Sequence, residues 1–209
     1  PSAQANHARC SSPRFTGLTC VSRIISGDAG SIRLRSVAKA TRPTGDRVKE
    51  SVFAALEARG LSLDCVVLDL FAGTGALGLE SLSRVASSVI LVETEKQAQA
   101  HCHKTTVQQQ QAATNIRTPT AVSNKNLDAF RYLKSATQVF DLVFLDPPYE
   151  FANSDLLKIL TSLRDLMSPG ATVVIERSDR TKDLDQPDWL EVISNKKFGS
   201  TKVRMYQKI

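Results

Sequence analysis

The segment from Val66 to Gly75 constrains the fold of this 209-residue chain more than any other stretch. It reads Val-Val-Leu-Asp-Leu-Phe-Ala-Gly-Thr-Gly, an apolar run of strand length that passes into a glycine turn, and a helical pattern begins at about Ala76. From Asp64 onward, strand-like and helix-like segments alternate. This alternation predicts one main α/β domain with a mostly parallel sheet and helices on both faces, and the chain is long enough to bury such a core.

Strand patterns recur through the rest of this domain. The candidate strands cover residues 66–70, 89–93, 116–122, 140–145 and 171–176. After Asp188 the helical pattern stops, and residues 190–196 and 201–207 are expected to form two closing strands. The sheet is therefore expected to continue to the end of the chain.

The chain is expected to have three parts. Residues 1–20 contain serine and arginine but no acid, so we expect a disordered leader or a transit-peptide remnant, with an ordinary flexible tail as the alternative. Residues 21–40 are expected to form a small basic hairpin, and residues 41–209 the main domain.

Turn and helix signals set the details of the N-terminal region. Strands are expected at residues 22–27 and 31–37, joined by the turn at residues 27–30. In the helix that follows, Thr44 is the expected N-cap and Gly60 the expected end.

The net charge of +6 is concentrated at the N-terminus. Residues 1–60 hold ten Lys and Arg against four Asp and Glu, whereas the remaining 149 residues carry 17 of each sign. Such an asymmetry is typical of a region that contacts phosphates, although a solvated basic face or a targeting remnant is the alternative. The candidate RNA-binding residues are Arg23, Arg33, Arg35, Arg42 and Arg47.

The glycine loop is a candidate cofactor site. Gly73 and Gly75 lack Cβ atoms, so backbone can approach a ligand closely and adopt positive φ. Asp69 ends the strand where α/β sheets bind ligands. The helix that follows points its positive end at the loop. The loop departs from the Gly-x-Gly-x-x-Gly pattern of dinucleotide sites, which favours S-adenosylmethionine (SAM). The candidate loop residues are Asp69, Phe71, Gly73 and Gly75.

Two further acids are candidates for the same cofactor. Glu93 ends the next strand, where a carboxylate could bind two ribose hydroxyls, and the alternative is a water-exposed strand end. Asp128 follows the third strand and could accept a hydrogen bond from the adenine amino group. Asp is also common in turns, and Asn126 is the competing position.

The second informative motif is Asp146-Pro147-Pro148-Tyr149, which follows an apolar run, residues 143–145. Each proline fixes its own φ and biases the residue before it toward extended geometry, so a rigid, shallow pocket is expected. The Asp146 carboxylate and nearby carbonyls could accept hydrogen bonds from a flat amino group, and Tyr149 could stack on its ring. Together with the glycine loop, this motif predicts a SAM-dependent amino methyltransferase.

Neither a metal site nor a membrane span is predicted. Cys10, Cys20, Cys65 and Cys102 show no C-x-x-C pairing, which favours a reducing compartment. Residues 101–103, His-Cys-His, are next to polar residues of an expected exposed helix, where adjacent side chains diverge. No apolar run approaches the roughly 20 residues of a membrane-spanning helix.

From Arg23 to Tyr206 the sequence resembles the RsmD family of methyltransferases. The matching segments are residues 23–27, 42–53, 69–80 and 144–149, and the second of these is the family-specific one. The chain has Ser26-Gly27 where the family usually has two glycines, and its hairpin is shorter. These departures concern the grip on RNA more than the chemistry.

The resemblance implies a fold, an activity and a set of site residues. The implied fold is a class I SAM-dependent methyltransferase (Rossmann-like) sheet of seven strands, the last antiparallel, with the small N-terminal β-hairpin as an extension. The implied reaction is methylation of the exocyclic N2 of a guanine in small-subunit (16S) ribosomal RNA. Pro147 and Pro148 are implied to hold the guanine with Asp146 and Tyr149, while SAM is implied to bind the acids and glycines named above.

Several alternatives stay open from the sequence. A D-P-P-Y pocket also accepts the N6 amine of adenine in DNA or RNA, and a non-catalytic ribosome-assembly factor could use the same fold only to bind RNA. A monomer is expected, acting on rRNA or on the assembling small subunit without metal. The leader fits an organelle copy in the chloroplast, with the mitochondrion or the cytoplasm as alternatives.

Overall fold

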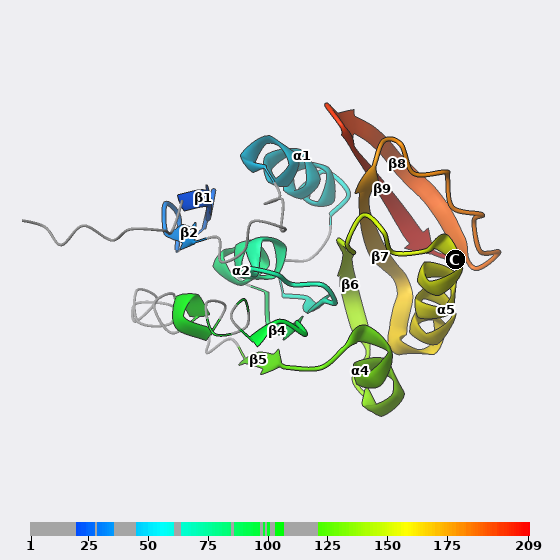
Figure 1. Ribbon diagram of the computed structural model, residues 1–209, viewed down its shortest axis with the longest axis horizontal. Helices are drawn as coiled ribbons and strands as arrows, with labels where there is room; N and C mark the ends of the chain where they lie inside the picture. Colours follow the sequence, from blue (N-terminus) through cyan, green and yellow to red (C-terminus); the bar gives the residue numbers. More distant parts are fainter. Residues whose placement is uncertain are drawn as a thin grey trace, which may run out of the picture.

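A computed structural model describes residues 20–27, 29–35, 45–60, 64–84, 86–96, 98, 100, 103–106 and 121–209. Figure 1 shows a central twisted sheet with helices on both sides and a small separate hairpin. The expected leader, apart from Cys20, and Arg42 lie outside the described residues. Within the described part of the chain, no helix is both long and apolar enough to cross a membrane.

The main sheet has seven strands in the order β5-β4-β3-β6-β7-β9-β8. Their bounds are Val66–Asp69 (β3), Ser88–Val92 (β4), Ala121–Lys125 (β5), Phe140–Leu145 (β6), Met167–Ser178 (β7), Leu190–Phe198 (β8) and Thr201–Lys208 (β9). Strands β3 to β7 pair in parallel, and β9 lies antiparallel between β7 and β8. The predicted seven-stranded sheet with an antiparallel last strand is confirmed.

Alternating side chains of the strands bury two separate cores. Leu142 and Phe144 of β6 belong to a core under α1 (Asp46–Glu57) and α2 (Ala76–Ser83), whereas Val143 and Leu145 belong to the opposite core. That second core lies under α4 (Ala129–Ser135) and α5 (Asn153–Leu163), which leads through a short 3-10 turn, Arg164–Leu166, into β7. Because both faces are covered, the central strands read as continuous apolar runs.

One predicted strand was wrong in its bounds. The sequence favoured residues 116–122, but β5 runs from Ala121 to Lys125 and pairs with β4 so that Val122 lies beside Val89. β5 is at the edge of the sheet and is only partly buried, so its polar residues Ser123 and Asn124 gave no strand signal.

The hairpin forms, with shorter strands than the sequence indicated. β1 (Cys20–Arg23) pairs antiparallel with β2 (Arg33–Arg35). β1 ends at Arg23, although the Ile24 amide still donates to the Ile32 carbonyl at 2.9 Å. The amides of Ile25 and Ser26 then donate to the buried Glu80 carboxylate of α2, at 2.6 and 3.1 Å.

Buried polar contacts fix this hairpin and α1 against α2. Lys49 is fully buried, donates to the Arg23 carbonyl and lies 3.5 Å from Asp46. Burial lowers the pKa of Lys49, while Asp46 and Glu80 oppose that shift. Ser83 Oγ accepts from the Ala29 amide at 2.9 Å.

The start of α1 also differs from the prediction. Its N-cap is Gly45, with no side-chain cap, rather than Thr44, which lies outside the described residues. Asp46 in the first turn supplies the favourable charge at this end of the helix. Gly60 follows the helix with φ of 71°, as its role at the end of the helix requires.

Candidate active site

The carboxyl ends of β3, β4, β5 and β6 meet at one edge of the sheet. Asp69 pairs with Leu91 on one side and Phe144 on the other, so the acids that follow these strands lie at a similar level. The chain proceeds from β3 outward to β5 and then returns to β6 on the other side of β3. This reversal is where open α/β sheets bind ligands.

The glycine loop has the conformation that its sequence predicts. Gly73 and Gly75 have φ of 52° and 81°, a region that other residues rarely adopt, and Gly75 is the N-cap of α2. A Cβ added at Gly73 would meet no described atom within 4 Å, which leaves open space beside this backbone. The positive end of α2 therefore faces an accessible turn.

Asp69 is held at the base of the loop. Its carboxylate is buried and accepts a hydrogen bond from the Gly78 amide at 3.0 Å. A Cβ at Gly78 would lie 2.2 Å from a methyl of Leu91 and 3.2 Å from Asp69 Oδ2, so glycine allows α2 to approach both. Gly78 was not among the predicted site residues, although it stands in the same Gly-rich segment.

Glu93 also binds the loop. Its Oε2 accepts from the Gly73 amide at 2.7 Å and its Oε1 from the Glu95 amide at 2.8 Å. Glu93 is therefore an ordered carboxylate at the mouth of the glycine turn rather than an exposed strand end.

Three acids give this edge a negative potential. Burial, together with the neighbouring charges of Asp146 and Glu93, raises the pKa of Asp69 to about 7, against the opposing Gly78 hydrogen bond. A site that disfavours a further negative charge favours a cation, and the SAM sulfonium and amino groups are cations. The three carboxylates at this edge therefore suit SAM as a ligand.

The two candidates for the adenine contact have separate structural tasks. Asp128 is the N-cap of α4, and its Oδ1 accepts from the Arg131 amide at 2.9 Å. The Asn126 amide donates to the carbonyls of Glu93 and Thr94, both at 3.1 Å, and so ties β5 to the end of β4. Both residues lie near Glu93 because Glu93 donates its own amide to the Lys125 carbonyl.

The proline segment follows β6 at the same edge. Asp146 is half-buried, Pro147 is buried and Pro148 is exposed. Tyr149 is 51% exposed, so part of its side chain is accessible to solvent. The Phe151 amide donates to the Pro148 carbonyl at 2.9 Å, which closes the segment into a turn before α5.

Aromatic contacts join the two motifs. Phe71 of the glycine loop packs edge-on against Phe151, with ring centroids 5.2 Å apart. Phe130 of α4 stacks on the same Phe151 ring, with centroids 6.4 Å apart. Asp146 lies near enough to Asp69 to affect its pKa. The structure therefore brings Asp69, Phe71, Gly73, Glu93 and Asp146 to one place.

Sequence reasoning missed two residues of this edge, Phe151 and Arg177. Arg177 lies on β7 and donates to the carbonyls of Phe151 and Pro148, at 2.6 and 3.5 Å. In the sequence, Arg177 directly follows the expected strand at residues 171–176. That position alone does not show that β7 pairs with β6, which is what brings Arg177 to the proline segment.

The predicted RNA-binding arginines are in diverse settings. Arg23 is exposed and lies 3.3 Å from Asp46, and Arg47 is exposed on α1. Arg33 and Arg35 lie on β2. Among the described residues, no group of three or more His, Cys, Asp or Glu could hold a metal ion.

Comparison with known proteins places this edge in context. Residues 22–207 match the family model described as Conserved hypothetical protein 95. The chain is 32% identical to ribosomal RNA small subunit methyltransferase D of Haemophilus influenzae, over 79% of this chain and 82% of that protein. Escherichia coli yhhF, provisionally assigned as a methyltransferase, superposes with a TM-score of 0.75 and 29% identity, over 92% of this chain and 98% of that chain.

A more distant structure shares the fold alone. An RNA methyltransferase of Salinibacter ruber, solved with S-adenosyl-L-homocysteine, gives a TM-score of 0.57 at 19% identity, over 80% of this chain and 94% of that chain. The sheet order and these likenesses define a Rossmann-like class I methyltransferase fold. Within that class, the match over residues 22–207 shows that the chain belongs to the RsmD family.

Proposed function

We propose that this protein transfers a methyl group from SAM to the exocyclic N2 amine of a guanine in small-subunit (16S) ribosomal RNA. Membership of the RsmD family supports the broader activity, SAM-dependent methylation of rRNA. The observation that carries the proposal is the contact of Phe71 with Phe151, which sets the glycine loop beside the D-P-P-Y segment. A donor and an acceptor bound at these two loops would be neighbours.

The glycine loop and its acids are proposed to bind the cofactor. SAM supplies an activated methyl group on a positively charged sulfur. Gly73 and Gly75 leave backbone accessible, and the N-terminus of α2 suits the carboxylate of the amino-acid moiety. Glu93, which is ordered by the Gly73 amide, is proposed to bind ribose hydroxyls, and Asp128, with Asn126 as the competing position, is proposed to contact the adenine.

The D-P-P-Y segment is proposed to prepare the acceptor amine. The amine lone pair is delocalised into the guanine ring, so the nitrogen is a poor nucleophile. Asp146 and the Pro147 carbonyl accept hydrogen bonds from the N–H groups of the amine. They stabilise the positive charge that develops as the nitrogen takes the methyl group. The nitrogen then releases a proton to Asp146 or, through it, to water. Tyr149 stacks on the base once it leaves its own helix or loop.

Alignment of the two loops contributes to the rate as well. Holding the reacting groups in one geometry removes entropy that a bimolecular encounter would lose, which is worth several kcal/mol in favourable cases. The contacts among the half-buried Phe71, Phe130 and Phe151 rings stiffen the junction between the loops.

The adenine-N6 amine is the second candidate acceptor, because a carboxylate and a carbonyl accept either amine. The names of the relatives, ribosomal RNA small subunit methyltransferase D among them, favour rRNA as the polymer. The decisive experiment incubates the protein with labelled SAM and unmodified small-subunit rRNA, then digests the RNA and identifies the product. N2-methylguanosine supports the proposal, N6-methyladenosine supports the alternative, and no label defeats both.

The setting of the reaction is part of the proposal. The protein is proposed to act as a monomer on rRNA or on the assembling small subunit. Its proposed phosphate contacts are Arg23, Arg33, Arg35, Arg42 and Arg47. The acid-free composition of residues 1–20 favours the chloroplast. A fluorescent fusion of residues 1–40 that accumulates in mitochondria or cytoplasm would contradict that location.

A further inference from the structure

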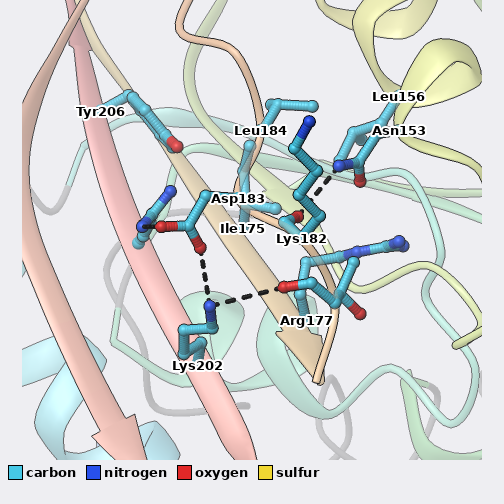
Figure 2. Close-up of a pocket in the computed structure, with 11 residues that line it drawn as sticks. Asn153, Leu156, Ile175, Arg177, Lys182, Asp183, Leu184, Lys202 and Tyr206 are labelled. Carbon is cyan, nitrogen blue, oxygen red and sulfur yellow. Dashed lines mark hydrogen bonds and ion pairs between the residues drawn. The ribbon is translucent and has the colours of Figure 1, made fainter. Parts of the chain in front are cut away.

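Arg177 lies beside the proline segment without belonging to either motif. β6 and β7 are parallel, and Leu145 pairs with Ile175. Continuing this register by two residues brings Arg177 to the level of Pro147. In Figure 2 the Arg177 side chain extends away from the ion pairs around Asp183.

The guanidinium of Arg177 joins two points of the acceptor loop. Its Nη2 donates to the Phe151 carbonyl at 2.6 Å, and its Nη1 reaches the Pro148 carbonyl at 3.5 Å. The Pro148 carbonyl also accepts a hydrogen bond from the Phe151 amide. Arg177 therefore binds a turn that already has its own backbone hydrogen bond. A planar fork of donors can span two carbonyls in this way, and an ammonium group cannot hold the same geometry.

The position is poorly optimised for stability alone. Nε of Arg177 is buried and has no hydrogen-bond partner among the described residues. Burial lowers the pKa of Arg177, and the negative charge of Asp146 opposes that shift. A half-buried arginine with one unsatisfied donor lowers the stability of the fold. Its presence therefore indicates a role in the site rather than in stability.

The neighbouring cations are engaged elsewhere. Lys202 donates to Asp183 at 2.6 Å, and Arg204 also pairs with Asp183, so these residues fix the chain between β7 and β8. Figure 2 shows Lys202 directed at Asp183. Among these neighbours, Arg177 is the one whose side-chain hydrogen bonds reach the proline segment.

We propose that Arg177 is a positioning residue for methyl transfer, a clamp on the Pro148 and Phe151 carbonyls that sets Asp146 and the Pro147 carbonyl for the acceptor amine. By holding the later carbonyls of the turn, it leaves the Pro147 carbonyl to the amine. This inference rests on the proposed acceptor site, and it assigns Arg177 no contact with the cofactor.

The test compares Arg177→Met, Arg177→Lys and a matched control, Arg164→Met. Arg164 is an exposed arginine at the opposite end of β7, so its loss removes the same charge far from the loop. Three readouts are taken from each protein: turnover on unmodified small-subunit rRNA, the SAM dissociation constant, and amide hydrogen exchange of the segment 147–153. Pro147 and Pro148 have no amide hydrogen, so the exchange of this segment reports residues 149–153.

Arg177→Met is expected to lower kcat at least tenfold, to change the SAM dissociation constant less than twofold, and to speed exchange at residues 147–153. Arg177→Lys keeps the charge and the stem, and should recover only part of kcat. The control should match the wild type. Should Arg177→Met fail to fold, Arg177→Lys decides alone.

Wild-type kcat in a folded Arg177→Met, or full recovery in Arg177→Lys, overturns the clamp. Unchanged exchange at residues 147–153 overturns it too, even if kcat falls. A wild-type protein with no turnover on rRNA contradicts the proposed acceptor instead, and the exchange measurement still tests the clamp.

Discussion

The glycine loop and the proline segment lie at one edge of the same sheet, but groups of opposite charge hold them. Carboxylates fix the glycine loop and the helix after it: Glu93 accepts a hydrogen bond from the Gly73 amide, and Asp69 accepts one from the Gly78 amide of α2. A guanidinium fixes the proline segment by donating to its carbonyls. In the proposed site, the first arrangement would place anions around the cationic groups of SAM, and the second would present a carboxylate and a carbonyl to the acceptor amine.

This difference shows how one edge of a sheet can bind both a cofactor and an acceptor base. The anionic side of the glycine loop suits the sulfonium and ammonium groups of SAM. The proline segment offers acceptors to an amine that must lose a proton. Variants of the two loops should therefore separate cofactor binding from methyl transfer.

The largest expected effect comes from Asp146→Ala. Loss of the carboxylate removes an acceptor for the amine and a stabiliser of developing charge, so turnover should fall by about 10²–10⁴-fold. The SAM dissociation constant, measured by calorimetry, should stay within a few-fold. Near-native turnover in this variant would make the assignment of the acceptor loop wrong.

Glu93→Ala should have the opposite signature. A hydrogen bond to a charged group contributes roughly 1.5–3 kcal/mol, so SAM affinity should fall by about 10–100-fold. Affinity for rRNA should change little, and saturating SAM should restore much of the turnover. Unchanged SAM binding by calorimetry would limit Glu93 to holding the Gly73 amide.

Tyr149→Ala sharpens the comparison on the acceptor side. Its exposed ring is expected to stack on the target base, a contact worth about 1–3 kcal/mol. KM for rRNA should rise while the SAM dissociation constant stays constant. Tyr149→Phe is the matched control, because it keeps the ring, and it should behave like the wild type.

The sequence predicted these two loops better than it predicted their supports. β6 was placed at Phe140–Leu145 without error, since a strand buried on both faces is a continuous apolar run. The positive φ of Gly73 and Gly75 also followed from their residue type. Arg177 could not be predicted, because its place beside Pro147 depends on the pairing of two strands.

Polar residues with structural roles were not predicted from the sequence. Arg23 was predicted to contact RNA, and this stays a prediction; its exposed side chain lies 3.3 Å from Asp46, and its carbonyl accepts a hydrogen bond from Lys49. The family-specific segment at residues 42–53 contributes Lys49, and the glycine segment contributes Glu80, to the docking of the hairpin. A buried lysine or glutamate in an amphipathic helix gives no sign in the sequence that its partner is a backbone group.

The pH dependence of stability tests the charge around the glycine loop. The pKa of Asp69 is about 7 in the folded protein and near 3.8 when unfolded, so the folded state binds the extra proton. The stability that Asp69 contributes is full below about pH 4 and is lost as pH rises toward 7. Urea unfolding should therefore show Asp69→Asn gaining on the wild type across this window and levelling off above pH 7. A constant difference between the two proteins would contradict the raised pKa.

The smallest effect is expected from the hairpin, whose described side-chain hydrogen bonds are with α1 and α2 rather than with the two loops. Replacing Arg33 and Arg35 with Ala should weaken rRNA binding and flatten its salt dependence by up to about two phosphate contacts. SAM binding should not change. If deletion of residues 1–19 weakens RNA binding while the double variant binds normally, the hairpin is not the RNA contact.

The central claim is that the glycine loop binds the cofactor and the proline segment binds the acceptor. It is tested most directly by amide hydrogen exchange of the wild-type protein with each ligand alone. S-adenosylhomocysteine is predicted to protect residues 71–80 and 93–96 and to leave residues 147–153 nearly unchanged. An unmodified small-subunit rRNA fragment is predicted to protect residues 147–153. Protection of residues 147–153 by S-adenosylhomocysteine, without protection at the glycine loop, would contradict the account.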